Sequence, residues 1–158
     1  MTQHARYDVT MDDLSDGQVI QLLQAHLAEM HKYSPPESIH ALDVAALKNP
    51  ALQFWSARQE HQVIGCGALK TLNPHDLEIK SMKVADAARG LGVGQAILKV
   101  LIEHALNRDA TTVYLETGTH DAFLPARRLY EKFGFTPCAA FGDYKPDPYS
   151  VFYRKELV

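Results

Sequence analysis

The segment from Arg89 to Gln95 contains the residues of this sequence that most directly indicate chemistry. Its three glycines alternate, at Gly90, Gly92 and Gly94. Glycine has no Cβ atom, so such a segment turns sharply and lets a ligand approach the backbone closely. The helix predicted to follow would offer unpaired amides and the positive end of its dipole, and both favour a phosphate group. The alternative is that these glycines only turn the chain.

Two well-known phosphate-binding patterns do not fit this segment. A dinucleotide-binding fingerprint requires G-x-G-x-x-G, and Gln95 occupies the place of its third glycine. A Walker loop requires G-x-x-x-x-G-K-[ST], and no Lys-Ser or Lys-Thr pair follows here. The segment does match R-x-x-G-x-G, beginning at Arg89, which is the pyrophosphate-binding signature of the GNAT family of N-acetyltransferases.

A second motif extends this resemblance. A later helix of the GNAT family typically reads N-x-x-A-x-x-L-Y-x-x-x-G-F, and this chain matches it at Ala126, Leu129, Tyr130, Gly134 and Phe135. Together with the order of the predicted elements, the two motifs make most of the chain resemble bacterial GNAT members of unassigned substrate. One position departs from the family pattern, because Phe123 stands where the family often has an asparagine that contacts the cofactor.

The resemblance implies that acetyl-CoA, as co-substrate, lies between two parallel strands that splay apart. By position these are the strand ending at Met82, Lys83 and Val84 and the strand at residues 111–116. Backbone amides near Met82 and Val84 would bind the pantetheine arm and polarise the acetyl carbonyl. The pyrophosphate would be bound by the segment Arg89, Gly90, Leu91, Gly92, Val93, Gly94 and Gln95. No metal is expected.

Proton transfer must accompany the reaction, because a lysine-like ammonium with a pKa of about 10.4 loses its proton at pH 7 at a cost of roughly 4 to 5 kcal/mol. The resemblance favours Glu78 as the base, and the alternative is a solvated carboxylate paired with Lys80. Glu116 is a second candidate, and water a third. Tyr130 matches the family position of the general acid that protonates the coenzyme A thiolate, although its helical spacing also permits a packing role.

The elements that must position these residues follow from periodicity and turn signals. Ser15 and Gln18 have the spacing of a capping box, which predicts a helix that ends near Tyr33. Asp121 is predicted to cap the helix that carries Tyr130. Further helices are expected at residues 42–47 and 92–107, and strands at 6–10, 52–57, 62–69, 77–84, 111–116, 138–141 and 149–155. Glycines at 65 and 67 indicate a bulge or a close backbone approach.

Bulk properties exclude several classes of protein. The chain has 158 residues and a formal net charge of -3, with no dense run of Lys or Arg, so nucleic-acid binding is not expected. No stretch approaches the ~20 apolar residues that cross a bilayer, and the first residues lack the apolar core of a signal peptide. Two cysteines do not make a disulfide framework. His26 and His31 are five apart, which misses the spacing of a helical metal pair. A cytoplasmic location follows.

We therefore expect one N-acetyltransferase domain over residues 1–158, with an α/β, GNAT-like fold in which helices flank a mixed sheet with splayed parallel strands. The leading function is direct transfer of acetyl to a primary amine of a small-molecule acceptor within a ternary complex. Two alternatives stay open: acetylation of a protein lysine or N-terminus, and a non-catalytic acetyl-CoA-binding regulatory module. Members of the family often dimerise, so a homodimer is a possible assembly.

Overall fold

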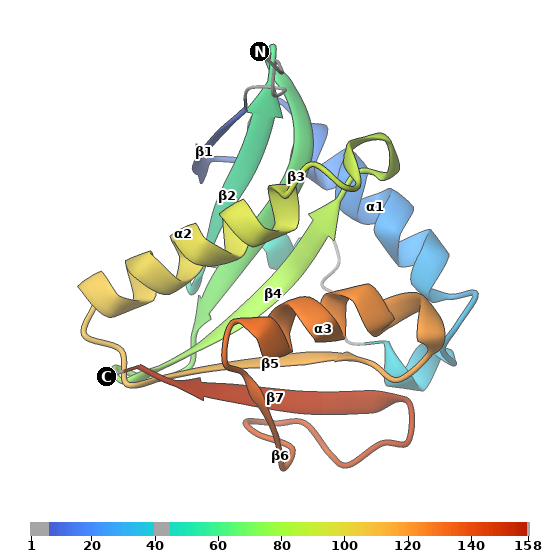
Figure 1. The fold of residues 1–158 in the computed structure, drawn as a ribbon, viewed down its shortest axis with the longest axis vertical. Helices are drawn as coiled ribbons and strands as arrows, with labels where there is room; N and C mark the ends of the chain where they lie inside the picture. Colours follow the sequence, from blue (N-terminus) through green and yellow to red (C-terminus); the bar gives the residue numbers. More distant parts are fainter. Residues whose placement is uncertain (1–6, 40–44, 158) are drawn as a thin grey trace.

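The computed structural model describes residues 7–39 and 45–157, which form one mixed α/β arrangement (Figure 1). Its described α-helices are α1 (Gln18–Met30), α2 (Val93–Asn107) and α3 (Leu124–Lys132). Its described strands are β1 (Asp8–Asp12), β2 (Leu52–Gln59), β3 (Gln62–Thr71), β4 (Asp76–Val84), β5 (Thr112–Gly118), β6 (Thr136–Cys138) and β7 (Ser150–Glu156). Short 3-10 turns lie between some of them, among them η3 (Asp86–Ala88) and η4 (Asp121–Phe123).

The strands form one sheet in the order β1-β2-β3-β4-β5-β7-β6. Neighbouring strands are antiparallel except β4 and β5, which are parallel. The segment that joins them contains α2, as a crossover between parallel strands requires. The predicted mixed sheet with one parallel pair is therefore confirmed.

Helices cover both faces of the sheet (Figure 1). α2 packs its apolar side on one face, where Ile97, Leu101 and Ala105 are fully buried against residues of β2 to β5. α1 packs on the opposite face, where Val19 is buried with Phe54 and Ala68. Within residues 7–39 and 45–157, no helix combines the length and apolar character needed to cross a membrane.

The parallel strands separate along their length. The last residue pair between β4 and β5 is Ile79 with Leu115, yet β4 continues to Val84 and β5 to Gly118. Beyond that pair the facing edges of the two strands are not paired with each other. Figure 1 shows β4 running above α3 and β5 below it as the two strands diverge. This wedge is the predicted splay.

A bulge interrupts β4 within the wedge. Cys66 pairs with Lys83 and Ala68 with Lys80, so two residues of β4 oppose the single Gly67 of β3. Ser81 lies in the bulge with a φ of 58°, a left-handed conformation that a residue with a side chain seldom adopts. A Cβ atom on Gly67 would lie 2.6 Å from the Met82 sulfur and 2.9 Å from Ile97, so a larger residue here would force these side chains to move. The prediction for Gly67 was a bulge or a close approach, and the structure shows a bulge on β4 opposite this glycine and a close approach of Met82 to it.

The predicted capping box at the start of α1 is wrong. The helix begins at Gln18 behind Gly17, with no side-chain cap, and Ser15 bonds to Asp13 instead. The Gln18 side chain reaches the β2–β3 hairpin, where it accepts from the Val63 amide at 2.8 Å and donates to the His61 carbonyl at 2.9 Å. These tertiary partners replace the local ones that the spacing suggested.

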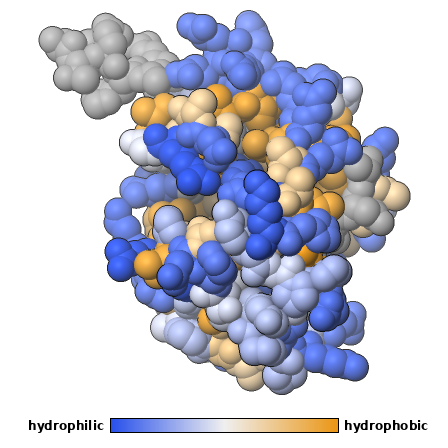
Figure 2. Space-filling model, turned by 90° about the vertical axis from the view of Figure 1, so that its right-hand side faces the viewer, coloured by the Kyte–Doolittle hydropathy of each residue, from blue (hydrophilic) through white to orange (hydrophobic). Residues whose placement is uncertain are grey.

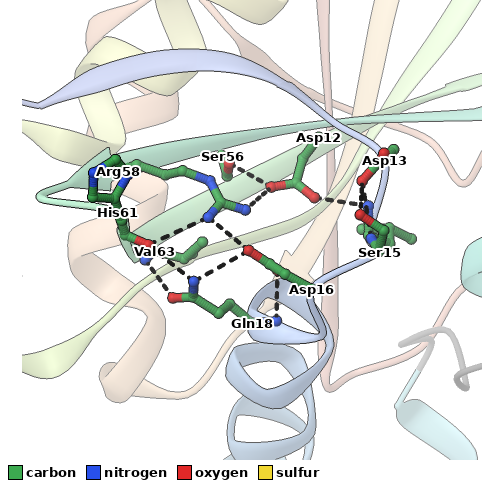
Figure 3. A network of polar contacts seen from close by, with 10 residues as sticks. Asp12, Asp13, Ser15, Asp16, Gln18, Ser56, Arg58, His61 and Val63 are labelled. Carbon is green, nitrogen blue, oxygen red and sulfur yellow. Dashed lines mark hydrogen bonds and ion pairs between the residues drawn. The ribbon is translucent and has the colours of Figure 1, made fainter.

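Arg58 on β2 forms ion pairs with residues of β1 and of the segment before α1 (Figure 3). The Arg58 guanidinium contacts Asp12 at 2.8 Å and Asp16 at 2.7 Å, and Ser56 donates to Asp12 at 2.6 Å. Asp12 is almost fully buried, so Arg58 and Ser56 supply the partners that its charge needs there. The network fixes the start of α1 to β1 and β2 and thereby places α1 over the sheet.

Other details differ from the prediction as well; β1, for example, occupies Asp8–Asp12 rather than 6–10. The side chain of His120, and not Asp121, accepts an amide hydrogen bond at the start of η4, which precedes α3. β6 occupies Thr136–Cys138 rather than 138–141, because its register is set by pairing with β7. The predicted helix at 42–47 lies partly outside the described residues, which show only a 3-10 turn at Ala46–Lys48.

Candidate active site

A cavity of about 150 Å³ opens where β4 and β5 separate. Side chains from α1, β4, β5, α3 and the loop between β6 and β7 line it, including Glu78, Glu116 and Tyr130. Figure 2 looks at the end of the molecule toward which the strands diverge, where hydrophobic surface lies among hydrophilic residues. The splay thus brings the three predicted proton-transfer residues to one cavity.

Glu78 is buried, with only 2% of its surface exposed. It is therefore not the solvated carboxylate of the alternative interpretation, although it does pair with Lys80 as that interpretation expected. The Tyr144 hydroxyl donates to Glu78 Oε2 at 2.6 Å, and Lys80 Nζ donates to the same oxygen at 3.3 Å. Lys80 Nζ also donates to the Tyr144 hydroxyl at 2.8 Å. Burial, followed by the nearby Glu78 charge, raises the pKa of Tyr144, so its phenol stays protonated. The hydrogen bonds from Tyr144 and Lys80 therefore hold the Glu78 carboxylate in one position.

Glu116 lies just beyond the last β4–β5 pair and lines the same cavity. Burial raises the pKa of Glu116 to about 7. Ser150 and Lys80 oppose this rise, while the charges of Glu78 and Asp147 add to it. A carboxyl group with a pKa near neutrality can both take up and release a proton at physiological pH.

Tyr130 extends from α3 into the wedge and is buried. Burial, with a contribution from the Glu116 charge, raises the pKa of Tyr130, which keeps the phenol protonated. Its ring packs edge-on against Phe135, with centroids 5.9 Å apart, and also lies near Tyr153. No hydrogen bond joins its hydroxyl to another residue of the described chain, so the packing orients a donor toward the cavity.

The glycine-rich turn precedes α2 on the other side of the wedge. Gly90 and Gly92 adopt φ values of 83° and 77°, in the left-handed region that favours glycine. Gly92 is the N-cap of α2, and no side chain caps the helix there. Open space surrounds Gly90, and the nearest atom to a Cβ on Gly92 would be the Tyr7 hydroxyl at 3.8 Å. Uncapped amides at an open helix start suit an anionic group.

Comparison with known proteins agrees with this geometry. The model of the Acetyltransferase (GNAT) family matches residues 19–135. The chain belongs to the GNAT family of acetyltransferases. It is 46% identical to an uncharacterized N-acetyltransferase of Bacillus subtilis, YsnE, over 94% of this chain and 99% of that protein. It is 36% identical to an IAA acetyltransferase of Azospirillum brasilense, over 89% of each chain.

A solved structure supports the same assignment. A proposed acyl-CoA N-acyltransferase from Klebsiella pneumoniae superposes with a TM-score of 0.82 and 30% identity, over 98% of this chain and 99% of that one. The sheet order, the splayed parallel pair and the flanking helices are thus those of GNAT structures. With N-acetyltransferases among its relatives, this GNAT chain is an N-acetyltransferase.

Phe123 marks where this GNAT member departs from the family motif. Its ring packs on Gly118, where a Cβ atom would lie 2.4 Å from it, and lies 6.1 Å from the Tyr33 ring. Tyr33 in turn lies 4.5 Å from the His120 ring, so aromatic side chains join the end of α1 to the start of α3. Arg127 holds the same turn by donating to the Gly118 and His120 carbonyls. The cavity wall here is aromatic where an asparagine would be polar.

His26 on α1 also lines the cavity. Its Nδ1 atom is buried without a hydrogen-bond partner among the described residues. Burial, together with the nearby Lys83 charge, lowers the pKa of His26 to about 4, so the imidazole is neutral at pH 7. An unpartnered ring nitrogen at a cavity wall is available to a bound molecule.

The remaining predicted residues lie around the same wedge. Met82 lines the cavity, whereas Lys83 turns to pair with Glu29 at 3.2 Å. Arg89 is largely exposed and pairs with Asp86 at 3.0 Å beside the glycine-rich turn. In the described part of the chain, no group of His, Cys, Asp and Glu is arranged to hold a metal ion.

Two site residues escaped the sequence analysis. Tyr144 lies in a loop without periodicity, 66 residues from the carboxylate that it contacts. The segment around it contains two prolines and no phosphate-binding or family motif, so no pattern indicated a role for this phenol. The sequence prediction considered His26 only as a metal ligand. Helical periodicity could have indicated that this residue lies on the buried side of α1.

Proposed function

We propose that this N-acetyltransferase moves acetyl from acetyl-CoA directly to a primary amine of a small-molecule acceptor within a ternary complex. One observation carries the proposal: the wedge between β4 and β5 holds an unpaired strand edge, a buried and a half-buried carboxyl group, and a buried phenol in one cavity. Direct transfer needs no enzyme nucleophile. Cys66 is buried, and burial raises its pKa to about 12, so it is poorly suited to that role.

Acetyl-CoA fits the open side of the wedge. The uncapped amides at the start of α2 would hold its pyrophosphate, and Arg89 stands at the same turn with an exposed guanidinium. The edge of β4 from Lys80 to Val84, unpaired with β5, would hydrogen-bond the pantetheine arm as an added strand does. When bound, acetyl-CoA supplies an activated acyl group; the chain's own residues bind it, orient it and handle the protons.

The bulge on β4 is well placed for the acyl carbonyl. It turns the backbone at Ser81 and redirects the neighbouring amides relative to the regular ladder. Amides fixed in this way stabilise negative charge that develops on a carbonyl oxygen, without reorganising during the reaction. The left-handed Ser81 and the contact of Met82 with Gly67 hold the bulge in one conformation.

Two carboxyl groups are candidates for the base that takes the proton from the amine. Glu78 is bound by Tyr144 and Lys80, so one oxygen already accepts two hydrogen bonds. Glu116 has a pKa near 7 and carries no such pair of donors. We favour Glu116 as the proton acceptor. Glu78 would instead hold Lys80 and Tyr144 in position within the cavity. Glu78 as the base remains the alternative, and variants of each residue distinguish them.

Tyr130 is the proposed proton donor to the departing thiolate of coenzyme A. Its phenol is protonated at neutral pH and its hydroxyl is free of partners within the described chain. Burial disfavours a phenolate, but it equally disfavours a thiolate leaving into the same cavity. The proton therefore moves between two groups with similar environments, which keeps the transfer feasible.

The experiment is a thiol-release assay of the purified protein with acetyl-CoA and a panel of small primary amines, with acetyl-CoA binding measured by calorimetry. We expect release that depends on an amine and that Tyr130→Phe slows without weakening binding. Acetylation of proteins in place of small amines would transfer the proposal to a protein substrate. Binding without turnover would indicate a regulatory module, and the absence of binding would refute the proposal. The relative named for IAA is consistent with a small acceptor.

A further inference from the structure

A second cavity lies beside the catalytic one, on the side away from the glycine-rich turn. Its volume is about 930 Å³, within the range of small-molecule sites. The β3–β4 turn and the loop from Phe141 to Asp147 line it, and it is partly open to solvent. Glu78, Lys80 and Tyr144 line both cavities and are therefore their common wall. The second cavity therefore adjoins the catalytic one at these three side chains.

The Lys80 ammonium is the cation of this wall. Only 10% of its side chain is exposed, and its Nζ lies 5.5 Å from the centre of the Tyr144 ring. An ammonium group has three N–H donors, of which two go to Glu78 Oε2 and the Tyr144 hydroxyl. No third acceptor contacts it within the described residues. A buried cation with an unused donor between two cavities is suited to receive an oxygen atom of a ligand.

Apart from Glu78, which already accepts one of the Lys80 donors, the acidic residues described around the second cavity do not contact Lys80. Asp76 accepts a hydrogen bond from Asn73 at 2.9 Å, and Asp147 accepts one from Ser38 at 2.6 Å. Glu37 and Asp143 are exposed at the rim, where solvent screens their charges. The inner wall therefore presents a cation, although the cavity as a whole contains several carboxylates.

Aromatic side chains form the rest of the inner wall. The Tyr114 and Phe141 rings stack with centroids 4.7 Å apart, and Phe141 meets the Tyr144 ring edge-on at 5.0 Å. Such a surface suits the carbon skeleton of a small molecule. Its polar end would then lie at Lys80, and its amine would lie farther in, toward Glu116.

We infer that the acceptor is a small amine that also carries a carboxylate, and that Lys80 binds this carboxylate and thereby determines acceptor specificity. The inference rests on the proposed acetyl transfer and names its substrate class. A free α-amino acid is the simplest molecule with both groups. Binding of its carboxylate to Lys80 would satisfy the unused donor and hold the amine at a fixed distance from the catalytic carboxyl groups.

The test compares matched acceptors in the thiol-release assay: each of several α-amino acids beside its carboxamide and its decarboxylated amine. We expect kcat/KM at least about ten-fold higher for the amino acid, because a charge-assisted hydrogen bond is lost in the others. The carboxamide has the most readily deprotonated amine of the three, so a preference for the amino acid would run against intrinsic reactivity.

Variants then assign the preference to Lys80. Lys80→Met should reduce the ratio of kcat/KM between amino acid and carboxamide roughly ten- to one-hundred-fold, mainly through the KM of the amino acid. Lys80→Arg keeps the cation and should retain part of the preference. Lys99→Met, on the exposed side of α2, is the matched control and should leave the ratio unchanged.

Two outcomes separate the inference from the proposed function. If the carboxamides and decarboxylated amines release thiol as fast as the amino acids in the wild-type protein, or if Lys80→Met keeps the preference, the inference is wrong and acetyl transfer stands. If no amine of any class releases thiol, the proposed function itself fails. The wild-type ratio decides the question even if Lys80→Met does not fold.

Discussion

Replacing Glu116 with glutamine provides the sharpest test of how protons move in this cavity. The substitution preserves the shape of the side chain and removes its titration. With a pKa of about 7 for Glu116, the fraction in the basic form falls to about one tenth at pH 6 and about one hundredth at pH 5. If Glu116 accepts the proton from the amine, kcat/KM for the acceptor should fall by the same factors below pH 7. In Glu116→Gln the rate should be low at every pH. The decline of kcat/KM below pH 7, which is the acidic limb of the pH profile, should disappear.

Glu78→Gln is the matched control, because it removes the other carboxylate of the same cavity. The Glu78 charge raises the pKa of Glu116, so its loss should move the limb to lower pH and leave its slope intact. The assay is thiol release between pH 5 and 9, with one acceptor used for all variants so that its own ionisation is common to each profile. The reasoning fails if Glu116→Gln keeps the wild-type limb, or if the limb disappears in Glu78→Gln instead.

Three further predictions follow from single residues. Tyr130→Phe should lower kcat by about two orders of magnitude and leave the Kd for acetyl-CoA unchanged, because it removes a proton donor and keeps the ring packing; equal kcat would exclude the acid role. Burial lowers the pKa of His26 to about 4, so as the pH falls below 6.5 this histidine is protonated in the unfolded chain before it is protonated in the folded protein. Urea titrations should therefore show the free energy of unfolding decreasing by up to about 3 kcal/mol between pH 6.5 and pH 4. His26→Phe should lack this pH-dependent decrease. Gly67→Ala should cost about 1 to 3 kcal/mol in the same titrations, since its Cβ would meet Met82, whereas an unaltered midpoint would show that the bulge adjusts.

Much of the fold could be predicted from local signals. Alternating and helical periodicity located the strands and helices that carry the site, and the alternating glycines located the start of α2. The predicted strands at 52–57 and 62–69 leave room for a short turn, and the structure has a β2–β3 hairpin there in which Glu60 and His61 both have positive φ. These features depend on residues close together in sequence, and for that reason the sequence reveals them.

The interior of the site depends on contacts that no local pattern encodes. Tyr144 meets Glu78 because the β6–β7 loop folds back over β4, and the loop has no periodicity that would indicate this. Gln18 bonds to the β2–β3 hairpin and not to its own helix, which is why the capping box failed. The left-handed Ser81 results from the register of β3 and β4, so only its partner Gly67 gave a hint of it.

The buried charges of the cavity are coupled, and the coupling bears on when the base is active. Lys80 lowers the pKa of Glu116, while Glu78 raises it. A carboxylate bound to Lys80 would offset that cation, so the pKa of Glu116 would rise and its basic form would become a stronger base. Its affinity for the proton of a neighbouring ammonium would thus be greatest when the acceptor is in place. Burying three charged groups costs stability, and a chain that needed only the fold could replace them with apolar side chains. Their presence at the splay is therefore best explained by this control of proton transfer.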